Sequence, residues 1–423
     1  MRDTWCSFIA VLYVALAVGG NGWIGPTPDP RPQQNFESFV SSKTAQYELY
    51  APSEKELNLA REEVDYAAEQ FRLYFGEDPP RIAVVVFGSP EAIQGFDFEP
   101  LRKKGLALLP WVSSEYIQKG GANIAALKDL GVVLRQGGPA EGVNVLALLP
   151  TGLPAGVDLR VGDSVVALNG KVPGSLQELE ENYKRILAGS PVELRIRRGA
   201  GEVNLSFVKP EAKGPKVQVQ QPRDSSGTSA APLRRSEARP LSHEAGHVFF
   251  VAYVNAKLGR TSPARGERAA HYGHELIPDW FDEAVATLCE FPALQQSRRE
   301  TMRKMLEKRI PLGELFVMEH PVASSLRDLV RQSREQQAPA GTKVQVVTGG
   351  ENLLSDPERA IVFYAESLTL AQFLAEKEGA GFIQQIAAAL MKGKPMAEAL
   401  RGAKFVPSDL GELEKTWVEW VKK

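Results

Sequence analysis

The segment Leu241-Ser-His-Glu-Ala-Gly-His-Val-Phe-Phe250 carries two histidines, His243 and His247, four residues apart, with Glu244 between them. Residues four apart lie one turn above each other on an α-helix, so both imidazoles can reach a single metal ion. Neutral nitrogen and carboxylate ligands hold Zn2+ and leave its fourth position for water. Glu244 lies on the same rim, where its carboxylate can take a proton from that water. The segment therefore predicts a helix with two zinc ligands and a general base.

A second segment resembles the element that completes such a site in a known family. Pro278-Asp-Trp-Phe-Asp-Glu283-Ala-Val-Ala-Thr-Leu-Cys-Glu290 opens with an acidic residue and continues with an apolar helical face. It resembles the W-x-x-E-G-x-A element of gluzincin metallopeptidases, whose glutamate binds zinc from a second helix. The resemblance implies that Glu283 is the third zinc ligand, with Ala284 in place of the usual glycine. Glu290, seven positions further on the same face, is a candidate partner for a zinc-bound imidazole.

Other histidines compete with this ligand set. His271 and His274, in the loop between the two segments, are alternative third ligands that would give a three-histidine site. We expect them at the surface or at the rim of the substrate site, because loop residues are less well positioned and the metzincin spacing is absent. His320 precedes Pro321 in an expected turn, which favours a structural role. A helix whose two histidines have other partners remains the alternative to a metal site.

A tyrosine further along the chain completes the expected catalytic group. The segment Phe363-Tyr-Ala-Glu-Ser-Leu-Thr-Leu-Ala-Gln-Phe-Leu374 resembles a helix found downstream in the same peptidases. The resemblance implies that the Tyr364 hydroxyl donates to the oxyanion formed when water attacks a carbonyl. A tyrosine that only packs in the core is the alternative. Glu366 is expected to face elsewhere and to be solvated.

The chain on either side of residues 130–209 reads as one α+β fold. Within residues 36–118, apolar positions from Leu57 to Phe75 repeat at steps of three and four, which predicts a helix that begins near Ser53 and stops at Gly76. The run Ile82-Ala-Val-Val-Val-Phe87 predicts a buried strand. Residues 241–423 read as mostly helical, with runs at 356–373, 382–390 and 410–421. This order resembles a gluzincin-like metallopeptidase, with a small N-terminal sheet followed by a mostly helical catalytic part.

Residues 130–209 form a β-rich piece of their own. Short strands are predicted at 131–134, 142–149, 164–168, 192–197 and 202–208, with one helix at 175–187. The run Gly152-Leu-Pro-Ala-Gly-Val-Asp-Leu-Arg-Val-Gly-Asp-Ser-Val-Val-Ala-Leu-Asn-Gly170 resembles PDZ domains, which add an extended peptide as an extra strand. The expected carboxylate-binding loop near Gly137 matches poorly. A structural or regulatory insert within one peptidase domain is therefore an equal alternative to peptide binding.

Two further stretches predict export and a tether. Residues 5–18 form an uncharged apolar run that is too short for a spanning helix and fits the core of a signal peptide, with a linker up to residue 35. An uncleaved anchor or a buried helix remains an alternative. Residues 210–240, rich in Pro, Ser, Gln and Gly, read as a disordered linker. The expected location is extracytoplasmic, either periplasmic or secreted, with membrane contact only through an N-terminal anchor.

Composition excludes several classes of protein. The 423 residues include 50 Lys and Arg against 52 Asp and Glu, a net charge of -2, so no nucleic-acid partner is expected. Two cysteines cannot form a disulfide framework or a cysteine-based metal cluster. An intramembrane protease is excluded because Asn255, Lys257 and Arg260 close the apolar run after the histidine motif.

The sequence therefore predicts an exported zinc metallopeptidase that acts on a peptide or protein substrate. No element that captures a free N-terminus precedes the histidine motif, so an endopeptidase is the default expectation. The β-rich piece is expected to bind a peptide of the substrate or of a partner, or to regulate the site. The alternative is an adaptor protein that binds partners through this piece and has a structural or idle metal site.

Overall fold

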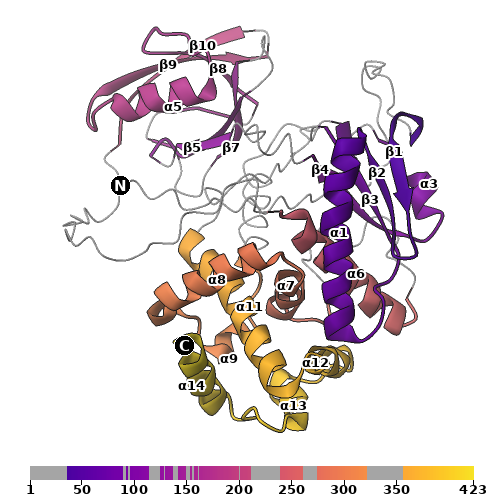
Figure 1. Cartoon of the computed structure of the whole chain (residues 1–423). Helices are drawn as coiled ribbons and strands as arrows, with labels where there is room; N and C mark the ends of the chain where they lie inside the picture. The colour runs from indigo at the N-terminus through magenta and orange to yellow at the C-terminus, as the bar shows by residue number, and fades with distance from the viewer. Residues whose placement is uncertain are drawn as a thin grey trace, which may run out of the picture. The chain divides into compact units, whose positions relative to one another are not determined.

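The computed structural model describes residues 36–88, 92–93, 96–113, 124–127, 129–136, 142–148, 153–154, 157–160, 162–199, 201–210, 239–260, 274–321 and 356–423. These residues form two compact units (Figure 1). One unit holds the strands β5 to β10 with the helix α5, and the other is built from the elements that precede and follow them in the chain. Helices and small sheets occur together, so the fold is α+β, as predicted.

The larger unit begins with a four-stranded sheet in the order β1-β2-β3-β4. Its strands are β1 (Val40–Lys43), β2 (Tyr47–Ala51), β3 (Ile82–Phe87) and β4 (Ala107–Val112). The first pair is antiparallel, whereas β2, β3 and β4 run parallel. Every residue of β3 is buried, which confirms the strand predicted from its continuous apolar run.

The long helix α1 (Glu54–Phe75) packs beside this sheet. The Ser53 side chain accepts a hydrogen bond from the backbone N–H of Glu56 and caps the first turn. Gly76 adopts the left-handed conformation, with φ of 69°, and ends the helix. Phe71 and Phe75 stack with ring centres 4.2 Å apart and pack against Tyr253 of a later helix. The predicted helix is therefore confirmed at both ends.

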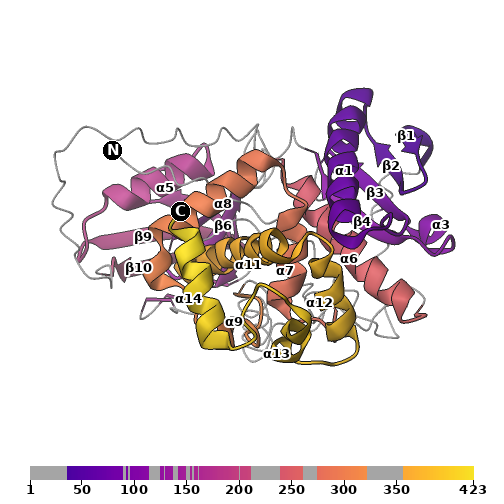
Figure 2. The ribbon, with the colours of Figure 1, turned by 60° about the horizontal axis from the view of Figure 1, so that its bottom comes forward.

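The rest of the larger unit is helical (Figure 2). Besides the four-residue helix α3 (Glu99–Arg102), its helices are α6 (Leu241–Lys257), α7 (Asp279–Leu288), α8 (Pro292–Lys304), α9 (Leu312–Leu315), α11 (Pro357–Glu378), α12 (Phe382–Met391), α13 (Met396–Ala399) and α14 (Leu410–Val421). The side chain of Asp356 accepts a hydrogen bond from the backbone N–H of Arg359 and caps α11, at the start of the helical run predicted at 356–373. Helix α7 packs between α6 and α11, and α11 also packs against α8. Of the predicted site residues, α6, α7 and α11 carry all but Glu290, which lies in the turn between α7 and α8.

The smaller unit is a six-stranded antiparallel sheet in the order β10-β9-β8-β7-β6-β5, with α5 (Leu176–Arg185) packed beside it. Its strands are β5 (Ile124–Leu127), β6 (Val132–Gln136), β7 (Val143–Leu148), β8 (Ser164–Leu168), β9 (Pro191–Arg198) and β10 (Gly201–Val208). The five predicted strands and the helix are confirmed. Strand β5 was not predicted, and it precedes the boundary expected at residue 130.

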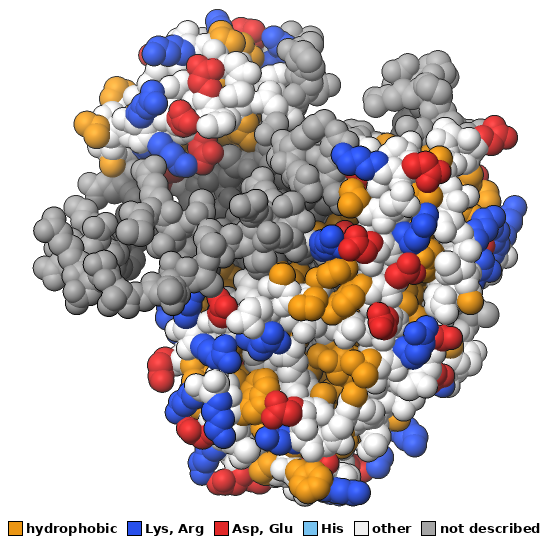
Figure 3. All heavy atoms as spheres, in the orientation of Figure 1, with side chains coloured by type: hydrophobic (Ala, Val, Ile, Leu, Met, Phe, Trp, Pro, Cys, Tyr) orange, Lys and Arg blue, Asp and Glu red, His pale blue; other side chains and the backbone are white. Residues whose placement is uncertain are grey.

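Several expectations lie outside the described residues. They include the apolar run at 5–18, the expected carboxylate-binding loop near Gly137, most of the linker at 210–240, and His271. Among the helices that the structure describes, none has both the length and the apolar character needed to cross a membrane. On the face drawn in Figure 3, acidic and basic side chains are interspersed over both units.

Candidate metal centre

The site forms where α6 and α7 approach each other closely at Gly246. A Cβ atom on Gly246 would lie only 2.9 Å from the Cα atom of Ala286 and 3.0 Å from the Cβ atom of Cys289. Glycine at this position therefore permits a helix contact that any other residue would obstruct. The contact brings the histidines of α6 opposite the acidic residues of α7.

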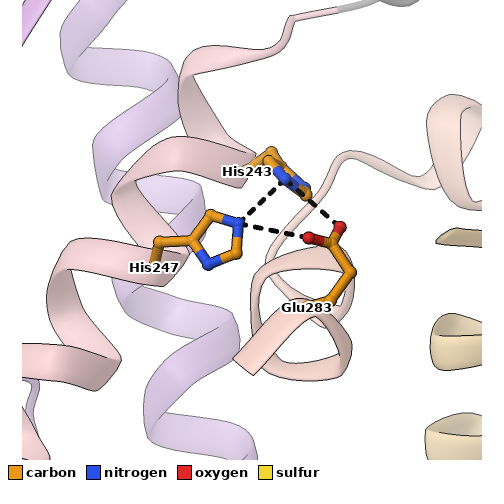
Figure 4. Close-up of side chains that lie close together, drawn as sticks. All are labelled: His243, His247 and Glu283. Carbon is orange, nitrogen blue, oxygen red and sulfur yellow. Dashed lines mark hydrogen bonds and ion pairs between the residues drawn. The ribbon is translucent and has the colours of Figure 1, made fainter. Parts of the chain in front are cut away.

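Three side chains from these helices meet in one cluster (Figure 4). His243 and His247 project from α6 with their Nε2 atoms 3.1 Å apart. Glu283 projects from α7, with Oε1 3.4 Å from Nε2 of His243 and Oε2 3.5 Å from Nε2 of His247. All three donor atoms lie within 4.8 Å of one another, and this buried group could hold a metal ion.

The other ring nitrogens of both histidines lie against buried carboxylates. Nδ1 of His247 lies 3.0 Å from Oδ2 of Asp282, and Nδ1 of His243 lies 2.8 Å from Oε1 of Glu290. A carboxylate at Nδ1 fixes the orientation of an imidazole and directs Nε2 toward a metal. The observed donor set of two Nε2 atoms and one carboxylate fits a Zn2+ ion. The position of Glu290 agrees with its sequence prediction, whereas Asp282 was missed.

Glu244 is buried, and it lies on α6 between His243 and His247 in the sequence. Burial raises the pKa of its carboxyl, and neighbouring Glu283 raises it further, although His243 and His247 oppose the shift. A carboxylate with a raised pKa is a stronger base, which suits proton transfer. The role of Glu244 as a general base stays a prediction.

Tyr364 lies on α11 next to this group. Its ring centre is 6.2 Å from that of His243. Burial and the nearby Glu283 raise the pKa of its hydroxyl well above the usual value, so the hydroxyl stays protonated and can donate a hydrogen bond. Tyr364 thus lies close to the candidate metal ligand His243.

His320 lies against the cluster, which its expected turn role did not indicate. Its Nε2 atom lies 3.4 Å from Oε2 of Glu283, and its ring packs edge-on against Tyr364 at 5.5 Å. Its backbone N–H donates to Oδ2 of Asp279, at the start of α7, at 2.7 Å. The expected turn role is therefore incomplete, because His320 also contacts a ligand residue. Only the scarcity of histidine, five in the chain, could have drawn attention to it.

Two other expectations are wrong. His274 is not at the surface: it is 1 % exposed, and its Nδ1 accepts a hydrogen bond from the backbone N–H of Leu276. Glu366 is not solvated either, because it is fully buried and accepts a hydrogen bond from the backbone N–H of Ile310 at 2.9 Å. Each of these buried side chains accepts a hydrogen bond from a backbone N–H of a turn or loop. Helical periodicity alone does not indicate such a role.

Comparisons with known proteins add no family or relative to this geometry. No family model matches the chain, and no curated protein matches it. The function therefore has to be inferred from the site itself.

Proposed function

We propose that this protein is an exported zinc metallopeptidase of the gluzincin type that hydrolyses peptide bonds, with endopeptidase action as its default. One observation carries the proposal. The Nε2 atoms of His243 and His247 converge with the carboxylate of Glu283, while each Nδ1 lies against a buried carboxylate. Peptidases with two histidines on one helix turn and a carboxylate on a second helix have this arrangement.

The residues take complementary roles in hydrolysis. A Zn2+ ion held by His243, His247 and Glu283 would supply the Lewis acidity that lowers the pKa of a water molecule. Glu244 accepts the proton of the attacking water and then delivers it to the nitrogen of the leaving amine. The Tyr364 hydroxyl donates a hydrogen bond to the carbonyl oxygen as negative charge develops there. Water on one side and the tyrosine hydroxyl on the other would thus act on the same carbonyl.

The smaller unit is proposed to be a PDZ-like domain inserted in the peptidase chain. Its antiparallel sheet with one packed helix supports this assignment, together with its position between the elements of the larger unit. Such a domain would bind an extended peptide of the substrate or a partner, or regulate the site. Export rests on the apolar run at residues 5–18.

The test is hydrolysis of an unstructured protein, fluorescein-labelled casein, by the zinc-loaded full chain and by Glu244→Gln. Glu358→Gln, an exposed glutamate on α11, is the matched control. We expect the wild type and the control to cleave casein, and Glu244→Gln to lose about 100-fold or more of the rate. The zinc content of all three proteins should be the same. A wild type that binds zinc but cleaves nothing would overturn the proposal and favour the adaptor function.

A further inference from the structure

We propose that Arg298, on α8, is a positioning residue of the metal centre that holds Glu290 against His243 and supports the ring of Tyr364. The inference rests on the proposed metal-dependent function and adds to it a residue outside the proposed ligand set. Its side chain is 11 % exposed, so the charge lies almost completely inside the fold. A buried arginine requires a specific partner.

The partner is Glu290, whose carboxylate accepts hydrogen bonds from Nε and Nη2 of the guanidinium group. Nε of Arg298 donates to Oε2 of Glu290 at 2.7 Å and lies 3.0 Å from Oε1. Nη2 donates to Oε1, the same oxygen that lies 2.8 Å from Nδ1 of His243. One carboxylate oxygen is thus shared between the arginine and a proposed zinc ligand. This geometry makes the orientation of His243 depend on Arg298.

The place of Glu290 in the fold explains why it needs a cation. It follows the C-terminal end of α7, where the helix dipole disfavours a negative charge. It is also fully buried, and a buried carboxylate without a cationic partner is costly. Gln295 of α8 donates to three carbonyl oxygens at this helix end, those of Thr287, Leu288 and Glu290. The joint between α7 and α8 is therefore rigid, and it presents Arg298 to Glu290 in a fixed position.

The same guanidinium group also contacts Tyr364. Its central carbon lies 4.9 Å from the centre of the tyrosine ring, within the range of a cation–π interaction. A single side chain therefore links the carboxylate behind His243 with the proposed oxyanion donor on α11. Lysine cannot reproduce this combination, because its ammonium group has neither the bidentate fork nor the flat face of arginine.

The proposal is tested by a double-mutant cycle on the full chain, with zinc affinity as the readout. The variants are Arg298→Met, Glu290→Gln and the two combined, and the zinc Kd is measured by competition with a chromophoric chelator. We expect each single variant to raise the Kd by about 10- to 100-fold. The combined variant should be no weaker than Glu290→Gln alone, since Arg298 acts on the metal through Glu290.

Matched variants separate this role from a merely structural one. Arg299→Met changes the neighbouring arginine, which pairs with Gln296 and Gln372, and should leave the Kd unchanged. Arg298→Lys keeps the charge and should fold, yet raise the Kd several-fold, so it serves if Arg298→Met fails to fold. Independent, additive losses in the cycle, or a wild-type Kd in both Arg298 variants, would overturn the inference. A wild type without zinc affinity would instead overturn the proposed function itself.

The contact with Tyr364 predicts a second effect, on turnover. With zinc saturating, Arg298→Met/Glu290→Gln should have a lower kcat than Glu290→Gln, because only the double variant lacks the support of the tyrosine ring. In a Tyr364→Phe background this difference should disappear, since the hydroxyl that the support positions is gone. A difference that persists without the hydroxyl would refute the link between Arg298 and Tyr364.

Discussion

Replacing Gly246 with alanine tests the central packing contact of the site. The new Cβ would lie 2.9 Å from the Cα atom of Ala286 and 3.3 Å from its carbonyl oxygen, and both are backbone atoms that cannot rotate away. Carbon atoms in contact lie about 3.5–4.0 Å apart, so α6 and α7 would have to separate by roughly 0.6–1.1 Å. Overpacking of this kind costs about 1–3 kcal/mol of stability.

The larger effect should be on zinc binding. The separation moves His243 and His247 away from Glu283, whereas metal–ligand distances tolerate only about 0.2 Å. We expect Gly246→Ala to raise the zinc Kd at least about tenfold, equal to about 1.4 kcal/mol. Chelator competition measures the Kd, and guanidinium denaturation of the metal-free protein measures stability.

A second glycine provides the control for this experiment. Gly313, in α9, has no atom within 4 Å of the place where its Cβ would lie, so Gly313→Ala should cause neither loss. Adding Ala286→Gly to Gly246→Ala should not restore binding, because the obstructing atoms of Ala286 belong to the backbone. Wild-type stability and zinc affinity in Gly246→Ala would refute the close helix contact and the geometry derived from it.

Three further predictions concern single side chains. Asp282→Asn should raise the zinc Kd about tenfold in chelator competition, because the group that orients Nδ1 of His247 loses its charge; an unchanged Kd would contradict that role. Tyr364→Phe should keep the wild-type zinc Kd but lower kcat for casein by about 100-fold, and equal rates would exclude the hydroxyl as an oxyanion donor. Burial raises the pKa of Glu366 to about 8, so the unfolded chain ionises first and the folded state loses stability as pH rises from the unfolded pKa toward 8. In Glu366→Gln the amide oxygen can still accept the hydrogen bond from the backbone N–H of Ile310. The free energy of unfolding of this variant, measured by guanidinium denaturation, should therefore rise relative to the wild type by up to a few kcal/mol between about pH 5 and about pH 8. A difference in stability that does not change with pH would refute a buried, ionisable carboxyl.

The sequence predicted those features that depend on the residues of a single helix or a single strand. The spacing of His243 and His247 depends on a single helical turn, and the apolar positions of α1 depend on a single amphipathic face. Ser53 and Asp356 predicted helix starts because capping involves only neighbouring residues. Glu283 required more: its role came from a resemblance, and the structure places it opposite the histidines.

Residues whose meaning depends on distant partners could not be predicted. Arg298 reads as an ordinary helix cation until α8 folds back and places it on Glu290. His320 precedes a proline in a stretch without periodicity, and only the fold brings it to Glu283. A glutamate such as Glu366 is expected to be exposed to solvent, but tertiary packing buries it. In each case the missing information is a contact with a residue outside the local helical or turn pattern, whether eight residues away, as for Arg298, or 56 residues away, as for Glu366.

The apolar run after the histidine motif shows that a helix buried in a protein core can have the same apolar composition as a membrane-spanning helix. Phe249, Phe250 and Val254 are all buried, because α6 packs against α1, α7 and β4. A helix enclosed on several sides is apolar around most of its circumference, whatever surrounds the protein. The run therefore reflects the central position of α6 in the larger unit.

The buried acids of the site differ in the direction in which their pKa values are shifted, and this difference matches their proposed roles. Burial opposes ionisation of Glu283 and Glu290 alike, yet His243 beside both, and Arg298 beside Glu290, outweigh it and lower the pKa of each carboxyl. His243 and His247 also lower the pKa of Glu244, but burial and the neighbouring Glu283 raise it by more, so its pKa is raised. Groups that must remain anionic to bind a cation are thereby separated from the group that must take up a proton. The neighbours of each acid, rather than its depth in the fold, thus distinguish the acids proposed to bind a metal from the acid proposed to transfer a proton.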